Sequence, residues 1–123
     1  MVWMAWSVEH TDEFGEWYHG LSGAQQDDIA AAGLLLMEQG PQLPFSYSSG
    51  INGSRYPHMR ELRVQSGGRP LRVFYAFDPR RSAILLIGGD KTGDDRFYER
   101  MVPIADQLYD VHIAEIRKEG LIP

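Results

Sequence analysis

Cysteine is absent from this chain of 123 residues, which excludes a disulfide framework and a thiolate zinc site. Long apolar runs are also missing, since the longest, "AILLIGG" at 83–89, is far too short to cross a bilayer. The N-terminal stretch "MVWMAWSVEH" shows neither a basic region nor a sustained apolar run, so no signal peptide is predicted. These absences favour a soluble cytoplasmic protein, and the length predicts a single domain over residues 1–123.

Positive charge is scarce overall but concentrated locally. The formal net charge is −5, yet residues 55–91 hold eight of the 12 Lys and Arg side chains and only three of the 17 Asp and Glu. The stretch "SRYPHMRELRVQSGGRPLRVFYAF" (54–77) contains five arginines and a single acid, Glu61. Because the field at a site depends on groups within about 8–10 Å, two interpretations stay open for this segment. The spacing of the charges alone favours a solvated strand surface that Glu61 and Asp78 neutralise; the other interpretation is a surface that binds something anionic.

The N-terminal third of the chain predicts one strand and two helices. "VWMAWSVEH" (2–10) alternates as a strand does. Thr11 is a suitable N-cap for a first helix. Ser22, with Gln25 three residues later, has the form of a capping box for a second helix, which the Gly-Pro pair at 40–41 ends. The expected apolar positions are Phe14, Trp17, Tyr18 and Leu21 in the first helix and Ile29, Ala32, Gly33, Leu36 and Met37 in the second.

The rest of the chain predicts a long loop, three strands and a final helix. The loop covers 40–58, and the strands cover 59–64, 71–77 and 83–89, close enough together for antiparallel pairing. Pro103 is expected to kink or split the final helix, which ends at Gly120. Strands grouped after helices indicate an α+β fold, with an N-terminal strand and a helical hairpin packed on a small antiparallel-dominated sheet. The expected apolar face of the final helix is Phe97, Met101, Ile104, Leu108 and Val111.

Strand alternation separates the arginines between two faces of the sheet. If Leu62 and Val64 face the helices, Arg63 lies on the other, open face. Arg72 is expected to neighbour it across the hairpin. Two adjacent arginines repel each other unless an anion or a carboxylate lies between them, and their planar, multi-donor groups suit phosphate oxygens.

In this order and spacing, the segments resemble the RelE/HigB-type toxins of bacterial toxin–antitoxin pairs, and the phage-derived HigB-like branch most of all. The resemblance runs from about residue 3 to 117 and is carried by "ELRV", the "SGG" turn, "RPLRVFYAF" and "ILLIGGDKTGDDRFYERMVPIADQLYDVHI". It implies a RelE-like fold and a metal-independent endoribonuclease without a cofactor. Such a toxin enters the ribosomal A site, cuts mRNA there and is neutralised by a helix-turn-helix antitoxin.

The resemblance also implies roles for matching positions. Arg72 matches the arginine of the family's Arg-x-x-Tyr strand and is expected to stabilise the transition state at the phosphate. Arg63 is expected to act in the same way or to contact rRNA. Lys91 matches a basic residue after the last strand, and Tyr98 matches an aromatic residue that stacks on a base or shares in proton transfer.

The general base is left open, because Met59 and Glu61 stand where strongly basic members carry lysines. His58 is one candidate, since imidazole titrates near neutral pH. Asp90 is another, either as the base or as a partner that orients Lys91. Electrostatic support for RNA binding is expected from Arg55, Arg60 and Arg69.

Two other functions remain open on the same fold. One is a non-catalytic, ParE-like inhibitor of DNA gyrase, and the other is an inactive phage-derived binding protein. "GGDKTG" lacks the spacing of a phosphate-binding loop, and no His/Asp/Glu spacing suggests a zinc site. The acidic flank of the final helix is interpreted as a solvated face, with antitoxin contact as the alternative; it comprises Asp106, Asp110, Glu115 and Glu119.

Overall fold

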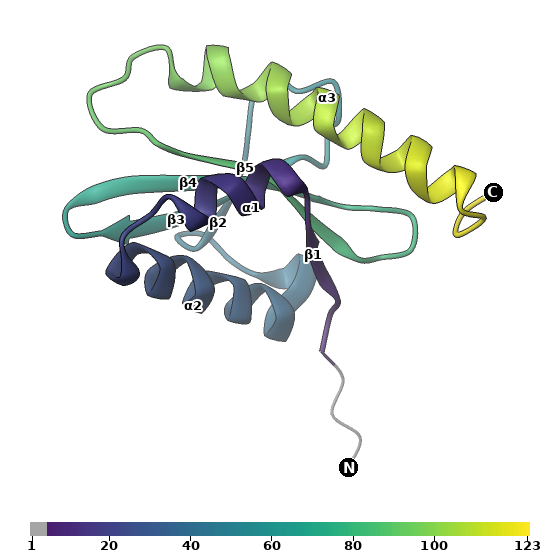
Figure 1. The fold of residues 1–123 in the computed structure, drawn as a ribbon, viewed down its shortest axis with the longest axis horizontal. Helices are drawn as coiled ribbons and strands as arrows, with labels where there is room; N and C mark the ends of the chain where they lie inside the picture. The colour runs from purple at the N-terminus through teal and green to yellow at the C-terminus, as the bar shows by residue number, and fades with distance from the viewer. Residues whose placement is uncertain (1–4) are drawn as a thin grey trace.

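A computed structural model describes residues 5–123 and shows one sheet with helices on both of its faces (Figure 1). The five strands lie in the order β1-β5-β4-β3-β2. Helices α1 (Asp12–His19) and α2 (Gly23–Gln39) cover one face, and α3 (Phe97–Lys118) covers the other. The predicted α+β fold with a C-terminal helix is confirmed.

The centre of the sheet is an antiparallel meander of the three predicted strands. β3 (Arg60–Ser66) pairs with β4 (Arg69–Phe77), and β4 pairs with β5 (Ala83–Asp90). β1 (Val8–His10) adds to β5 in parallel. It is shorter than the strand predicted over 2–10, of which residues 2–4 lie outside the described part of the chain.

The predicted loop over 40–58 is not wholly irregular, which corrects the sequence interpretation. It contains a short 3-10 helix, η1 (Gly40–Gln42), and an edge strand, β2 (Ser48–Gly50), that pairs antiparallel with β3. The residues "SSG" have neither the apolar alternation nor the β-propensity of a strand. Their strand conformation depends on pairing with β3, which the local sequence does not reveal.

Both predicted N-terminal caps are present. The Thr11 hydroxyl accepts a hydrogen bond from the Phe14 amide at 2.9 Å, and Ser22 and Gln25 form the reciprocal capping box of α2. Ile29 and Leu36 of α2 are buried as predicted, whereas Met37 is exposed.

α3 departs from the prediction in two ways. Pro103 does not split the helix, because it lies on the exposed side, where water can hydrate a carbonyl that lacks its helical donor. The buried face is also turned by about one position from the predicted one, so Ile104 and Val111 are 41% and 48% exposed. The residues that are buried are Phe97, Met101, Val102, Ala105, Asp106, Tyr109, His112 and Ile116.

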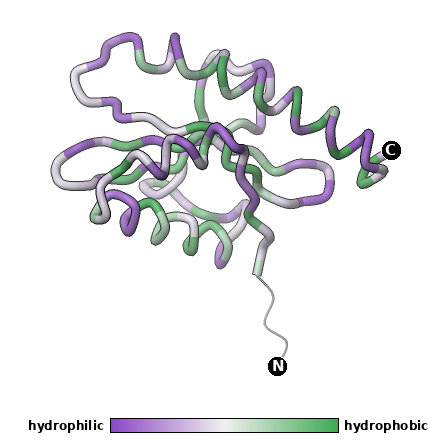
Figure 2. The backbone as a smooth tube through the Cα atoms, viewed as in Figure 1, coloured by the Kyte–Doolittle hydropathy of each residue, from purple (hydrophilic) through white to green (hydrophobic). Residues whose placement is uncertain are grey.

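Two apolar clusters hold these layers together. One joins β3 and β4 to α1 and α2, and the other joins β4 and β5 to α3. Along α2 and α3, hydrophobic and hydrophilic residues alternate, as expected of helices with one face on a sheet (Figure 2). Within residues 5–123, no helix is long and apolar enough to span a membrane.

Candidate active site

The two arginines singled out from the sequence are direct cross-strand neighbours. Arg63 of β3 pairs with Arg72 of β4, and Arg72 pairs with Gly89 of β5. On the other side, the Arg63 amide donates to the carbonyl of Tyr47 at 2.8 Å, just before β2. The predicted placement of Arg63 beside Arg72 is therefore confirmed.

The sheet face that carries these arginines was expected to be open, but it is partly covered. α3 covers it over Phe74 and Ala76, and Arg72 is only 5% exposed. The reason is that the sheet has helices on both faces, whereas the sequence interpretation placed helices on one. The site thus lies at the border between the α3 layer and the uncovered end of the sheet.

Glu61 occupies the centre of the site. Its Oε1 lies 3.5 Å from Arg72 Nε, and its Oε2 lies 3.7 Å from the nearest guanidinium nitrogen of Arg63. The hydroxyl of Tyr98, at the start of α3, donates to Oε1 at 2.7 Å. The sequence predicted that Glu61 would neutralise the arginines but did not place it among the site residues, although a single acid inside an arginine-rich strand is a signal for that role.

The Arg72 guanidinium retains hydrogen-bonding capacity. One of its terminal nitrogens donates to the Leu71 carbonyl at 3.0 Å. Its Nε is buried and faces Glu61 Oε1 at 3.5 Å, but no acceptor among residues 5–123 meets it in hydrogen-bonding geometry. A buried donor without an acceptor is costly in a folded protein and often marks the place of a ligand.

Tyr98 is held in its protonated form. Burial raises the pKa of its phenol, and the hydrogen bond to the Glu61 carboxylate raises it further. Lys91 Nζ lies 5.2 Å from the centre of the Tyr98 ring. The site therefore combines a carboxylate, two guanidiniums, an ammonium and a phenol that can donate a proton.

Two hollows flank this cluster. One, of about 310 Å³, is lined by Glu61, Tyr98 and residues 50–52. The other, of about 320 Å³, is lined by Arg63, Arg72, Tyr47 and neighbouring residues. Beside the second hollow, Phe45 is 72% exposed and Tyr47 is 50% exposed. The Arg63 guanidinium lies 5.0 Å from the Phe45 ring centre, so an aromatic surface borders the arginine pair.

Other predicted site residues lie elsewhere. His58 is exposed, and its Nε2 lies 3.2 Å from the Tyr109 hydroxyl, beside the middle of α3. Arg55 pairs with Asp110 of α3. Arg60 points to the opposite sheet face and donates to the Ser48 hydroxyl at 2.9 Å. The structure does not bring these three side chains to Glu61.

The start of β4 and the end of β5 hold a separate ion pair. Arg69 lies 3.0 Å from an Asp90 carboxylate oxygen. Asp90 also accepts hydrogen bonds from the amide and hydroxyl of Thr92, so its contacts are with Thr92 and Arg69 rather than with Lys91. In the described part of the chain, no three His, Asp or Glu side chains are grouped so that they could hold a metal ion.

Comparison with known proteins agrees with the resemblance read from the sequence. The chain is 33% identical over 114 residues to HigB2, a candidate toxin of Mycobacterium tuberculosis (strain ATCC 25618 / H37Rv), across 91% of this chain. The match spans 56% of HigB2, so the chain corresponds to just over half the length of that relative. A second candidate toxin of the same organism, HigB3, is 40% identical over 92 residues, which are 74% of this chain and 79% of HigB3.

A family model assigns most of the chain directly. The model of the family described as phage-derived protein Gp49-like matches residues 16–110, a range that includes α2, the whole antiparallel meander and the cluster around Glu61. The predicted kinship with HigB-type toxins is confirmed, and the chain belongs to the phage-derived Gp49-like family.

Proposed function

We propose that the chain is the toxin of a toxin–antitoxin pair and cuts mRNA in the ribosomal A site, with the Glu61 cluster as its active site. The observation that supports this most is the buried arrangement of Arg72, Glu61 and Tyr98, in which the Glu61 carboxylate lies 3.5 Å from Arg72 Nε and accepts a hydrogen bond from Tyr98. Preorganised donors of this kind are what a charged transition state requires.

The chemistry is attack of a ribose 2′-oxygen on the adjacent phosphorus. Glu61 accepts the 2′-hydroxyl proton, and the new bond to phosphorus forms as the bond to the 5′-oxygen breaks. Tyr98 gives its proton to that leaving 5′-oxygen. Arg72 and Arg63 stabilise the extra negative charge on the phosphoryl oxygens. The products are a 2′,3′-cyclic phosphate and a 5′-hydroxyl.

This proposal gives the role of base to Glu61 rather than to His58. The Glu61 carboxylate lies among the two arginines and the tyrosine that the reaction needs. His58 instead contacts Tyr109, near the far end of β4. Lys91, beside Tyr98, adds positive charge close to the leaving group.

The exposed aromatic residues favour RNA as the substrate over a protein target. Phe45 and Tyr47 lie next to Arg63, where unstacked bases of a single strand can lie on their rings while the arginines contact the backbone. The partners in this proposal are the A-site codon, rRNA and a helix-turn-helix antitoxin encoded next to the toxin. The place of action is the cytoplasm, where ribosomes translate.

The test compares wild-type protein with Arg72→Lys and Arg63→Ala on purified translating ribosomes. Wild type should cut mRNA inside the A-site codon and leave 2′,3′-cyclic phosphate ends, and both variants should lose most of this activity. Arg72→Lys is preferred to Arg72→Ala, because removing the whole side chain would leave the buried Glu61 carboxylate with much less compensation.

Expression of the chain in bacterial cells distinguishes the nuclease from the two competing functions. Intact transcripts together with DNA damage would support the gyrase inhibitor and contradict the nuclease. Expression without any growth defect would support the inactive binding protein.

A further inference from the structure

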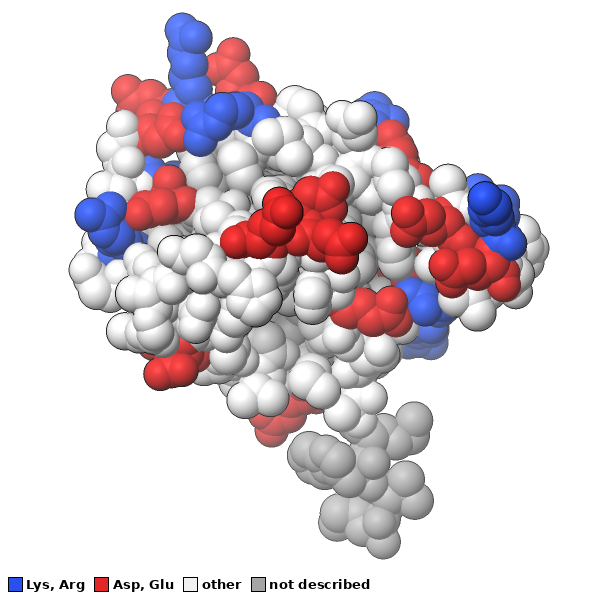
Figure 3. Space-filling model, in the orientation of Figure 1, with Lys and Arg blue, Asp and Glu red and all other residues white. Residues whose placement is uncertain are grey.

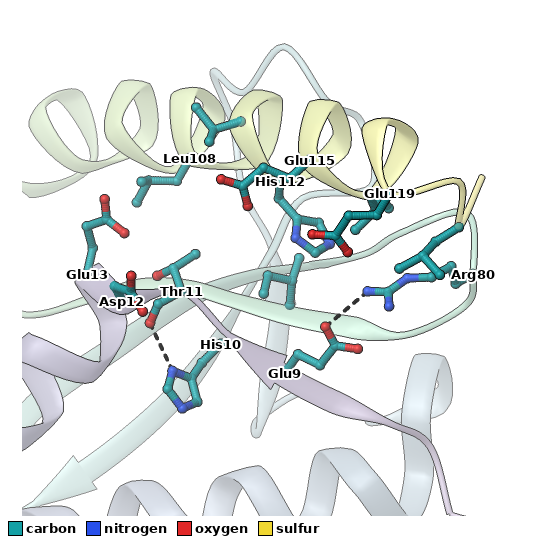
Figure 4. A pocket seen from close by; sticks show the side chains of 14 residues that line it. Glu9, His10, Thr11, Asp12, Glu13, Arg80, Leu108, His112, Glu115 and Glu119 are labelled. Carbon is teal, nitrogen blue, oxygen red and sulfur yellow. Dashed lines mark hydrogen bonds and ion pairs between the residues drawn. The ribbon is translucent and has the colours of Figure 1, made fainter. Parts of the chain in front are cut away.

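A further hollow lies far from the Glu61 cluster. It measures about 360 Å³ and separates the start of α1 from the second half of α3 (Figure 4). Its exposed apolar side chains are Val111 and Leu121, which are 48% and 50% exposed, while Ile84 and Ile116 behind them are almost fully buried. We call this feature the α1–α3 groove.

Carboxylates surround the α1–α3 groove on several sides. They come from β1 (Glu9), the first turn of α1 (Asp12 and Glu13), the last turn of α3 (Glu115) and the C-cap of that helix (Glu119), as Figure 4 shows. In the space-filling view, a group of acidic side chains lies over α1 in the middle of the visible face, without a basic neighbour (Figure 3).

The cations of the groove are already engaged. Arg80 contacts Asp78 at 2.7 Å and Glu9 at 3.1 Å. His112 lies 2.9 Å from the same Asp78 carboxylate. The carboxylates that remain have no Lys or Arg within 4.0 Å in the part of the chain that the structure describes; they are Asp12, Glu13, Glu115 and Glu119.

The fold explains two of these four acids but not the other two. Asp12 and Glu13 stand in the first turn of α1, where negative charge stabilises a helix. Glu115 and Glu119 stand at i and i+4 near the C-terminus of α3, where they repel each other and oppose the helix dipole. Arg117 and Lys118 in the same turn complement the helix dipole, but within residues 5–123 neither glutamate forms an ion pair within 4.0 Å.

The acidic flank of α3 is therefore not one uniform surface. Asp106 accepts hydrogen bonds from the Ser54 hydroxyl at 2.5 Å and the Arg55 amide at 2.9 Å. Asp110 bonds to Tyr56 and pairs with Arg55. These two aspartates anchor the segment before β3. Glu115 and Glu119 have no such structural task.

We propose that the α1–α3 groove is a docking site for the antitoxin. The segment that fits it is a short cationic one, with two or more Lys or Arg side chains against the carboxylates and an apolar side chain on the floor. A volume of about 360 Å³ accommodates a few side chains of one segment rather than a folded surface. The inference rests on the antitoxin partner of the proposed function and not on RNA cleavage.

The position of the groove favours a protein partner over RNA. Four uncompensated carboxylates repel phosphates, so this face is expected to stay away from rRNA when the arginine side binds mRNA. Tyr98 and Glu115 are separated by roughly 25 Å along α3 at 1.5 Å per residue. An antitoxin segment in the groove therefore leaves the Glu61 cluster uncovered.

The test uses the full-length chain and the purified antitoxin encoded beside it. Glu115→Lys/Glu119→Lys should weaken binding by about 10- to 100-fold at low salt, and growth arrest should persist when the antitoxin is co-expressed. Glu115→Gln/Glu119→Gln should weaken binding less and flatten its salt dependence. Toxicity without antitoxin should be unchanged in both. Glu38→Lys, an exposed charge reversal in α2 on the opposite sheet face, should bind as wild type does.

Several outcomes would overturn the inference. One is an unchanged Kd for the antitoxin in both double variants. If the lysine variant fails to fold, the Kd of the glutamine variant alone decides whether the groove binds the antitoxin. Another is a wild-type dimer in light scattering that the lysine variant loses, which would make the groove an interface between two copies of the chain. If the antitoxin does not bind the wild-type chain, both the antitoxin partner and the docking role of the α1–α3 groove are overturned. Cleavage of mRNA on ribosomes would still support the proposed nuclease in that case.

Discussion

At the scale of single residues, the structure changes the interpretation of Glu61 most. In the sequence it is an isolated acid that opposes the positive charge of its strand. In the structure its carboxylate contacts Arg63, Arg72 and Tyr98. Replacement by the isosteric Gln removes the base, and the expected loss in cleavage rate is about 10²- to 10⁴-fold.

Tyr98→Phe separates proton donation from packing. The ring remains beside Lys91, but the hydroxyl that serves Glu61 is lost. Cleavage on ribosomes should fall, and urea unfolding should show a loss of about 1–3 kcal/mol because a buried carboxylate loses a donor. Unchanged cleavage by both Tyr98→Phe and Glu61→Gln would contradict the assignment of the active site.

The exposed aromatic residues allow a third prediction at this scale. Phe45→Ala or Tyr47→Ala should raise KM for ribosome-bound mRNA by roughly 5- to 100-fold with little change in kcat, since each ring stacks on a base and takes no part in bond breaking. Tyr47→Phe keeps the ring and should behave as wild type. Leu34→Ala removes an equally exposed apolar side chain from α2 and is the matched control. A fall in kcat alone would contradict the stacking role.

At the scale of elements, close packing between α1 and β5 depends on a glycine. A Cβ built at Gly88 would overlap the ring of Trp17, whereas one at Gly33 within α2 would meet no atom of residues 5–123 within 4 Å, its own helix backbone aside. Gly88→Ala should therefore destabilise the fold by about 1–3 kcal/mol. Gly33→Ala should stabilise it by about 0.5–1 kcal/mol, since alanine is the better helix former. Urea unfolding of both variants tests this, and equal effects would contradict the packing argument.

Element patterns also show where sequence reasoning reaches its limit. The paired strands follow from alternation and the Gly-Gly turn, because each residue's face is set by a period of two. The buried face of α3 was predicted about one position away, because several helical registers place apolar residues on a stripe. The register of α3 on the sheet is seen only in the structure, where Ala105, Tyr109 and His112 are buried. Likewise, β2 is formed only through its pairing with β3.

At the scale of the whole molecule, a buried ion network joins distant segments. Asp78, at the end of β4, contacts Arg80 and His112, and Arg80 reaches Glu9 of β1. Burial raises the pKa of Asp78, but hydrogen bonds from Arg80 and His112 lower it more, so its pKa lies below the usual range. A carboxyl with a depressed folded pKa contributes stability above its unfolded pKa of about 3.9 and loses it as pH falls through the folded value.

Asp78→Asn is expected to lower the stability of the fold and to weaken its dependence on acidic pH. Urea unfolding at pH 7 should show a loss of about 3–5 kcal/mol, because Arg80 and His112 lose a buried partner. The variant should also lose part of the acid sensitivity that wild type shows below about pH 4. Asp94→Asn removes an exposed pair with Arg100 and should change stability by less than about 1 kcal/mol. Identical acid profiles for wild type and Asp78→Asn would contradict this role.

The sequence by itself determined the α+β class, the two N-terminal helix caps, the register of the Arg63–Arg72 hairpin and the kinship with HigB-type toxins. These features depend on short-range periodicity, on capping residues and on the order of motifs, all of which can be read locally. Only the tertiary structure decided that α3 covers the arginine face, that Glu61 and Tyr98 meet there, and that His58 lies elsewhere. Those contacts join segments far apart in the chain, and their geometry is set by packing across the sheet rather than by any local pattern.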